Sequence, residues 1–216
     1  MLLLLRLMSN RGMHSRRRAT NVAGFTMVEM AVVLAVIGII SAIALPVIGR
    51  ALANMRLNGA ARAISNTAAS AKTRAAANFT RARVFVDLTS NSYHIETWNG
   101  VAWVPVGGTV TLPTGVNFGF GIVGSAPPNT QPGIQQATNC LDNGTPPLVP
   151  PAPIANTACF VFNSRGIPID NLAQPTQWDA FYITDTVTVL GVTVTPTGLI
   201  GVWATPVLAA PQWTIS

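Results

Sequence analysis

An apolar stretch from Met30 to Ile48, without a single charged side chain, constrains this chain more than any other feature. At a rise of about 1.5 Å per residue, a helix of this length comes close to the ~30 Å hydrocarbon thickness of a bilayer, so it can span a membrane. One acid, Glu29, stands directly before it. An ionised carboxylate at the edge of a membrane span costs several kcal/mol unless it is paired, which makes Glu29 a candidate functional residue.

The residues before the stretch differ from an ordinary secretory signal. Such a signal has a shorter apolar core with a small-residue cleavage site after it. Here the small residue, Gly24, precedes the core, and arginines lie further upstream. Cleavage after Gly24 would therefore keep the apolar helix in the mature protein, which would begin at Phe25.

The segment from Gly24 to Pro46, GFTMVEMAVVLAVIGIISAIALP, resembles the class III signal of type IV prepilins and pseudopilins. The resemblance implies cleavage between Gly24 and Phe25 by a prepilin peptidase, and N-methylation of Phe25 by the same enzyme. It implies that Glu29 pairs with the free α-amino group of Phe25 on a neighbouring subunit. Pro46 would then be a point of flexibility in the helix, or a boundary effect near the membrane exit.

The basic residues of the chain fall into two groups. The leader, residues 1–24, holds five arginines and no acid, and it begins at Met1 or at Met13. Its arginines favour a cytoplasmic N-terminus. The resemblance then places a single-pass protein in the bacterial inner membrane, in contact with its lipid, with the C-terminal head in the periplasm and incorporated into a pilus or pseudopilus.

Without the leader the chain is nearly neutral, with eight Lys or Arg against seven Asp or Glu. Residues 50–83 carry seven positive side chains and no acid, whereas residues 84–216 carry only Arg165 against six acids. The basic segment is either a solvated helix face or a surface for anionic lipid or an acidic neighbour. The acidic head gives nucleic-acid binding little electrostatic support.

The helical pattern continues beyond the membrane span. Helix-favouring alanines recur there at i, i+3 and i+4 spacing, which predicts one helix over about 25 to 79. We expect a leader at 1–24, a transmembrane or filament-core helix at 25–49, its amphipathic continuation at 50–80 and a β-rich head at 81–216. The residues on the expected buried stripe are Leu57, Ala61, Ile64, Ala68, Ala71 and Ala75.

After Arg83 the periodicity changes to that of strands. The pair Asn99-Gly100 is a strong hairpin signal between strands at 93–98 and 101–106. Gly191 is expected to form a turn or bulge, because glycine weakens a strand interior. The predicted fold class is α+β and type IV pilin-like, with the long helix packed on an antiparallel β-sheet. Further strands are expected at 84–86, 109–112, 116–122, 158–162, 180–184, 187–194 and 199–203.

A segment rich in Pro, Gly, Asn and Thr interrupts the head at 124–156 and cannot supply a regular core strand. We expect it on the surface. Cys140 and Cys159 are an even pair compatible with a disulfide in an oxidising compartment, and two unpaired buried thiols are the alternative. A disulfide would close a loop of about 20 residues, for which the chain-entropy model gives on the order of 3 kcal/mol.

Two short motifs in the head, at 162–168 (FNSRGIP) and 195–198 (TPTG), resemble the minor pseudopilin H of type II secretion and FimT-type minor pilins. Some FimT-like members are thought to touch DNA through basic residues after the glycine of the last hairpin. In this chain Leu199, Ile200 and Gly201 follow that glycine, so the basic residues are missing. The alternative for the first motif is an ordinary turn with a left-handed glycine.

No pattern typical of an enzyme is present. His94 is the one histidine after the leader, and with Ser92 and Glu96 it is expected to form a polar, solvent-facing row on one strand. The sequence shows no nucleophile elbow, phosphate loop or metal-ligand spacing. We expect no catalysis, no metal and no cofactor.

The sequence therefore predicts a minor pseudopilin of type II secretion that assembles with other pilin-like subunits near a filament tip. A FimT-like minor pilin in pilus assembly or DNA uptake is the first alternative. A single-pass anchored periplasmic domain that never polymerises is the second, and a major filament subunit is a third.

Overall fold

The computed structural model describes residues 24–143, 150–170, 173–176 and 178–216, and only the backbone of Pro46. The predicted leader, apart from Gly24, and residues 144–149 of the predicted loop lie outside the described residues. The chain divides into two compact units, residues 1–46 and 47–216. One helix, α1 (Met27–Ala77), begins in the first unit and ends in the second.

The head contains two antiparallel sheets, where the sequence predicted one. Sheet A has the strand order β3-β2-β1-β5-β6 and sheet B has the order β10-β9-β8-β7-β4. The predicted α+β class with a long N-terminal helix and antiparallel strands is confirmed. The strands are β1 (Ala82–Asp87), β2 (Ser92–Trp98), β3 (Trp103–Thr111), β4 (Asn117–Phe118), β5 (Thr157–Phe162), β6 (Pro168–Ile169), β7 (Asp179–Thr184), β8 (Thr188–Val194), β9 (Ile200–Pro206) and β10 (Thr214–Ile215).

The predicted hairpin is present between β2 and β3. The Asn99 side chain accepts hydrogen bonds from the backbone N–H groups of Val101 and Ala102, and Gly100 has a φ of 99°. The two strands predicted at 101–106 and 109–112 are one strand, β3, whose register shifts opposite Tyr93 and Ile95 of β2. The strand predicted at 116–122 is reduced to the two residues of β4.

Within the first unit, the side chains of α1 are exposed, Met27 and Ile43 among them. In the part of the chain that the structure describes, α1 is the one helix long and apolar enough to cross a membrane.

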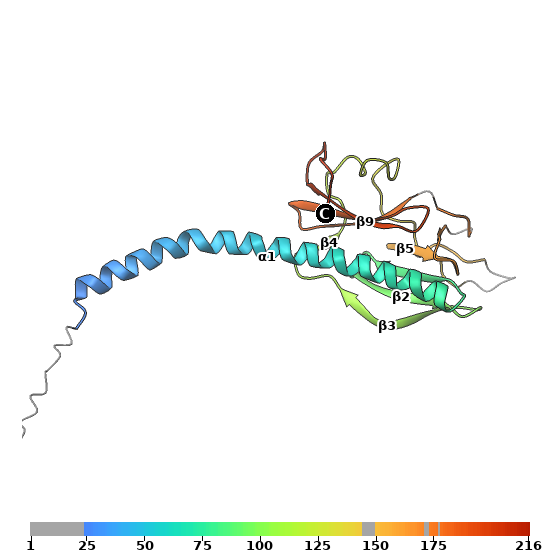
Figure 1. Ribbon diagram of the computed structural model, residues 1–216, viewed down its shortest axis with the longest axis horizontal. Helices are drawn as coiled ribbons and strands as arrows, with labels where there is room; N and C mark the ends of the chain where they lie inside the picture. Colours follow the sequence, from blue (N-terminus) through green and yellow to red (C-terminus); the bar gives the residue numbers. More distant parts are fainter. Residues whose placement is uncertain (1–23, 144–149, 171–172, 177) are drawn as a thin grey trace, which may run out of the picture. The chain divides into compact units, whose positions relative to one another are not determined.

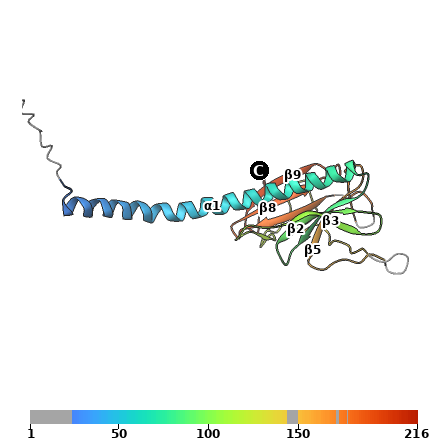
Figure 2. The ribbon, with the colours of Figure 1, turned by 90° about the horizontal axis from the view of Figure 1, so that it is seen from below.

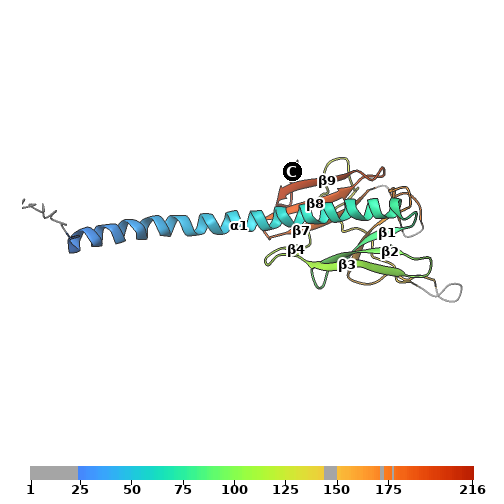
Figure 3. The ribbon, with the colours of Figure 1, turned by 60° about the horizontal axis from the view of Figure 1, so that its bottom comes forward.

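Within the second unit, α1 buries a stripe of mostly small side chains against both sheets. In Figure 1 the part of α1 that accompanies the head runs along its strands, with β9 on one side and β3 on the other, and Figures 2 and 3 show the same placement. Alanine side chains allow the strands to approach the helix backbone closely. The predicted stripe is confirmed, because its members are at most 1% exposed: Leu57, Ala61, Ile64, Ala68, Ala71 and Ala75.

Aromatic rings join the two sheets beside this stripe. Phe160 of β5 stacks on Phe181 of β7, with ring centroids 3.7 Å apart. Phe118 of β4 meets both Phe181 and Tyr93 of β2 edge to face, at 6.5 Å in each case. Since Phe160 and Tyr93 belong to sheet A and Phe118 and Phe181 to sheet B, the core is continuous across the sheets.

The prediction that the segment 124–156 lies on the surface is partly wrong. Its first half covers sheet B, and Gln131 and Ala137 are buried. The Gln136 side chain accepts a hydrogen bond from the N–H of Tyr182 and donates one to its carbonyl, as a neighbouring strand would. The Tyr182 hydroxyl donates to Gln131. The loop therefore satisfies backbone groups that a two-residue β4 leaves open along β7.

The predicted solvent-facing row of Ser92, His94 and Glu96 is also partly wrong. Glu96 is buried and forms a salt bridge with Arg83 of β1, while its other carboxylate oxygen lies 3.1 Å from the His94 ring nitrogen. Arg83 also donates to the carbonyl of Leu141. Burial lowers the pKa of Arg83, and the Glu96 carboxylate acts in the opposite direction. Arg83 is therefore a core residue, whereas the sequence predicted for its segment either a solvated face or a surface for anionic lipid or an acidic neighbour.

Gly191 forms neither a turn nor a bulge, so that prediction is wrong. It lies inside β8, directly opposite Tyr182 of β7. A Cβ atom at Gly191 would lie only 2.8 Å from the Tyr182 ring. The glycine is needed because the aromatic ring of its cross-strand neighbour occupies the space of a side chain.

Replacing Gly191 with Ala should lower the free energy of unfolding by about 1–3 kcal/mol, because the buried, hydrogen-bonded Tyr182 ring cannot move aside without strain. Gly108 of β3 is the matched control. A Cβ there meets nothing within 4 Å, so Gly108→Ala should change stability by less than about 0.5 kcal/mol. Denaturant unfolding of both variants measures the difference, and equal stabilities would contradict the packing account.

Asp179 is a buried acid at the start of β7. Burial, together with the charge of Asp170, raises its pKa from 3.8 to about 7. Between these values the folded protein retains a proton that the unfolded chain releases. Because the folded state then binds more protons, the free energy of unfolding should fall as the pH rises through this window.

Asp179→Asn should remove this dependence, since the amide does not ionise. Relative to the unmodified protein, the variant should gain stability on the order of a few kcal/mol between about pH 4 and pH 8. Unfolding curves at several pH values test this, and contributions from other titrating groups cancel in the difference. Parallel stability profiles for the two proteins would show that Asp179 does not retain its proton.

Candidate functional site

The junction before α1 is the first candidate site. Gly24 and Phe25 are exposed and precede the helix, with the Phe25 side chain 78% exposed. Helix α1 begins at Met27, so the peptide bond between Gly24 and Phe25 lies in non-helical chain. A protease that requires an extended, accessible backbone would find both residues outside the helix.

Thr26 and Glu29 form a reciprocal capping box at the start of α1. The Thr26 hydroxyl accepts a hydrogen bond from the N–H of Glu29 at 3.2 Å. The Glu29 carboxylate accepts from the N–H and from the hydroxyl of Thr26, both at 3.3 Å. This pattern satisfies helix N–H groups that have no partner within the helix. The capping box was not among the features predicted from the sequence, although the spacing Thr-x-x-Glu before an apolar run is its signature.

The capping box gives Glu29 a defined position in the first turn of α1. A carboxylate there is favoured by the positive end of the helix dipole. Its two hydrogen bonds come from one neighbouring residue of the same chain, so the carboxylate keeps further acceptor sites. The arrangement can accept a cation without losing the helix cap.

Pro46 lies within α1, and the helix continues beyond it to Ala77. The proline therefore does not end the helix. Its role as a point of flexibility stays a prediction.

Cys140 and Cys159 form a disulfide, with their Cα atoms 5.1 Å apart. The bond attaches the loop that covers sheet B to strand β5 of sheet A. Hydrogen bonds surround it: the Cys159 N–H donates to the carbonyl of Thr138, and the Cys140 N–H donates to the hydroxyl of Thr157. The disulfide was one of two possibilities left open by the sequence, and it fits an oxidising compartment.

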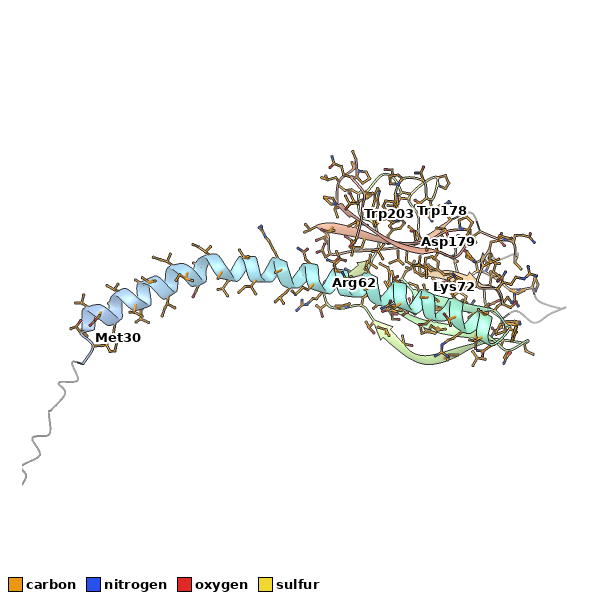
Figure 4. The ribbon with its side chains drawn as sticks, in the orientation of Figure 1. Met30, Arg62, Lys72, Trp178, Asp179 and Trp203 are labelled. Carbon is orange, nitrogen blue, oxygen red and sulfur yellow. A yellow bond between two sulfur atoms is a disulfide. The ribbon has the colours of Figure 1, made fainter. Side chains whose placement is uncertain are left out.

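The two short head motifs converge on one lysine. Lys72 of α1 donates a hydrogen bond of 2.8 Å to the carbonyl of Gly198 in the turn between β8 and β9. Gly166, in the turn between β5 and β6, also lies against the Lys72 side chain: a Cβ there would come within 3.1 Å of it. Figure 4 marks Lys72 on the part of α1 that belongs to the head.

Both turns require glycine at this contact. Gly166 and Gly198 have φ values of 72° and 77°, which L side chains rarely adopt. A Cβ at Gly198 would also lie 2.7 Å from the carbonyl oxygen of Gly166. The alternative that the sequence offered for the first motif, a turn with a left-handed glycine after Arg165, is what the structure contains, and close packing of two turns on α1 explains it. The sequence left Lys72 either on a solvated face or on a surface for anionic lipid or an acidic neighbour, since nothing local reveals a contact across 126 residues.

Comparison with known proteins bears on the N-terminal segment. Residues 20–45 match the family described as "Prokaryotic N-terminal methylation motif". The match covers Gly24, Phe25 and Glu29 and ends one residue before Pro46. It confirms the resemblance of this segment to the processed N-termini of type IV pilins and pseudopilins.

The minor pseudopilin EpsH from the Type 2 Secretion System of Vibrio cholerae is similar, with a TM-score of 0.41 and 14% sequence identity, over 68% of this chain and 94% of that chain. No curated protein sequence matches the chain.

Removing the disulfide by replacing Cys140 and Cys159 with Ala should lower the free energy of unfolding by about 3 kcal/mol, the loop-closure contribution for 20 residues. Denaturant unfolding measures this. Adding a reductant should bring the unmodified protein to about the same stability and leave the variant unchanged. A variant as stable as the oxidised protein would contradict a stabilising role for the bond.

Proposed function

We propose that this chain is a minor pseudopilin of a type II secretion system, trimmed after Gly24 and assembled through its N-terminal helix. The observation that carries this proposal is the methylation motif over residues 20–45, placed at the start of a helix whose residues from Met30 to Ile48 carry no charge. Its partners are then a prepilin peptidase that also methylates Phe25, other pilin-like subunits and the lipid of the inner membrane. The head lies in the periplasm.

Charge pairing is the physical basis of assembly in this proposal. Cleavage exposes the α-amino group of Phe25, which pairs with a carboxylate in its protonated, positively charged form. A positive charge at the N-terminus of α1 is disfavoured by the helix dipole, and Glu29 in the first turn offsets it. In an apolar filament core or membrane both charges need a partner. Pairing with a neighbouring subunit satisfies them and sets the axial register of the two helices.

The capping box gives this pairing a fixed starting geometry. Thr26 holds the Glu29 carboxylate at the first turn before any partner is present. Fewer side-chain rotamers are then lost when a neighbouring amine approaches.

The function follows from assembly, not from catalysis. We place the subunit at or near the tip of a pseudopilus, where its β head caps or primes the filament. The disulfide supports this view over a major subunit, because it lies mid-domain and leaves the C-terminal strand β10 outside its loop.

A FimT-like role in DNA uptake finds no support at the last hairpin. Its tip carries Leu199, which is 68% exposed, and the nearby cation Lys72 is already bound to a backbone carbonyl. Phosphate binding relies on several accessible Lys or Arg side chains.

Two substitutions of Glu29 separate charge pairing from helix capping. Glu29→Ala removes both, whereas Glu29→Gln keeps a side chain that serves in a capping box but carries no charge. Both variants should be cleaved and should be incorporated into sheared filaments at least about tenfold less than the unmodified subunit, a loss of more than ~1.4 kcal/mol. Quantitative blotting of filament and membrane fractions measures incorporation.

Thr26→Ala is the matched control, since it removes the cap and keeps the carboxylate. It should be incorporated much better than Glu29→Gln. If Glu29→Gln assembles normally and Thr26→Ala does not, the role of Glu29 is capping and the pairing proposal is wrong.

A further inference from the structure

The end of α1 inside the head has an unusual residue at its cap. The N–H of Thr80 donates to the carbonyl of Ala75 and the N–H of Phe79 to that of Ala76, which is the Schellman pattern. The residue at the left-handed position of this motif is most often glycine. Here it is Phe79, with a φ of 50° and a side chain 87% exposed. A bulky, exposed aromatic ring in a strained conformation suggests a role other than folding.

A pocket of about 330 Å³ lies beside Phe79. Strand β2 contributes Trp98 and the turn after β5 contributes Asn163 and Ser164, so three separate elements form its wall. None of its lining residues is acidic. The lining residues are Phe79, Thr80, Arg81, Trp98, Asn163 and Ser164.

Arg81 is the cation of this pocket, and indole rings hold it in place. Its guanidinium carbon lies 4.8 Å from the ring centroid of Trp98 and 5.8 Å from that of Trp103. Among the described residues, its guanidinium forms no salt bridge and no hydrogen bond. The neighbouring Arg83, by contrast, is bound to Glu96 and to the Leu141 carbonyl. Within the described part of the chain, Arg81 therefore has N–H donors that can serve an acceptor on a bound partner.

Arg81 and Trp98 also line a second pocket, which contains acidic side chains. A smaller pocket of about 100 Å³ contains Asp142 and Asp170, together with Trp103 and both arginines. Asp142 accepts a hydrogen bond from the N–H of Ala152, and Asp170 accepts one from that of Gln174. The described residues that line the pocket beside Phe79 include no acid, so an anionic group is better accommodated in that pocket.

We infer that the pocket formed by Phe79, Arg81 and Trp98 binds a protein segment that presents a carboxylate next to an apolar side chain. The carboxylate is accepted by the guanidinium of Arg81, which two indole rings orient. The apolar side chain packs against Phe79 and Trp98. Tryptophan, arginine and exposed aromatic residues are the side chains that most often carry binding energy in protein interfaces.

A nucleic acid is the less favoured occupant. Binding to a phosphate backbone needs several cations in sequence, and Arg81 is the one cation among the described residues that line this pocket. A single oriented arginine between aromatic rings matches one carboxylate better than a row of phosphates. This inference does not depend on the proposed function.

The test uses the full chain in detergent and isothermal titration calorimetry. The probe is an N-acetylated, C-amidated peptide in which aspartate and phenylalanine alternate, and the control peptide has asparagine in place of each aspartate. The acidic peptide should bind at least about tenfold more tightly than the control peptide. Arg81→Gln should weaken the binding of the acidic peptide at least about tenfold. Arg74 is an exposed arginine in the last turn of α1, outside the pocket, so Arg74→Gln should leave this binding unchanged.

Phe79→Gly separates binding from folding. Glycine is preferred at this cap position, so the variant should be as stable as the unmodified protein or more so. Its affinity for the acidic peptide should nevertheless fall about fivefold or more. A thermal-unfolding midpoint that falls together with affinity would instead assign Phe79 to the fold.

Three outcomes would overturn the inference. Both peptides could bind equally, Arg81→Gln could bind as well as the unmodified protein, or the acidic peptide could fail to bind at all. An oligothymidylate that binds in an Arg81-dependent way while the peptide does not would assign the pocket to single-stranded nucleic acid.

Discussion

Helix α1 combines an exposed apolar part with a part that is buried in the head, and the rest of the molecule depends on this combination. From Met30 to Ile48, α1 carries no charge, and nearly all of its described side chains are exposed. Further along, the same helix presents a stripe of alanines that the two sheets bury completely. The first part is therefore built for lipid or for other subunits, and the second part is the core of the head. A polar substitution in the first part would weaken contacts with lipid or other subunits, whereas one in the second part would bury a polar group in the core of the head.

The features that the sequence predicted correctly are those with a local cause. The alanine stripe from Leu57 to Ala75, the Asn99-Gly100 hairpin and the left-handed Gly166 are set by periodicity or by one turn. The wrong predictions concern cross-strand and long-range contacts. Gly191 is explained only by the ring of Tyr182, and the burial of Glu96 depends on Arg83 of the neighbouring strand.

Other features were missed because their sequence signal is weak. Strands β6 and β10 have two residues each, too few to show alternation. The side chain of Gln136 replaces a strand along β7, and a glutamine in a loop carries no such indication. The two sites that bear on function differ in how visible they are in the sequence. The Thr26–Glu29 capping box could have been recognised from its spacing, whereas the pocket around Arg81 joins three elements and could not.

The account of the N-terminal junction rests on a new amine at Phe25 that neutralises Glu29 of a neighbouring subunit. Mass spectrometry of the intact protein, purified from its native membrane, tests this most directly. The account predicts a chain that begins at Phe25 and carries one additional methyl group on its α-nitrogen. A mature chain that retains its leader, or that begins at any other residue, would contradict it.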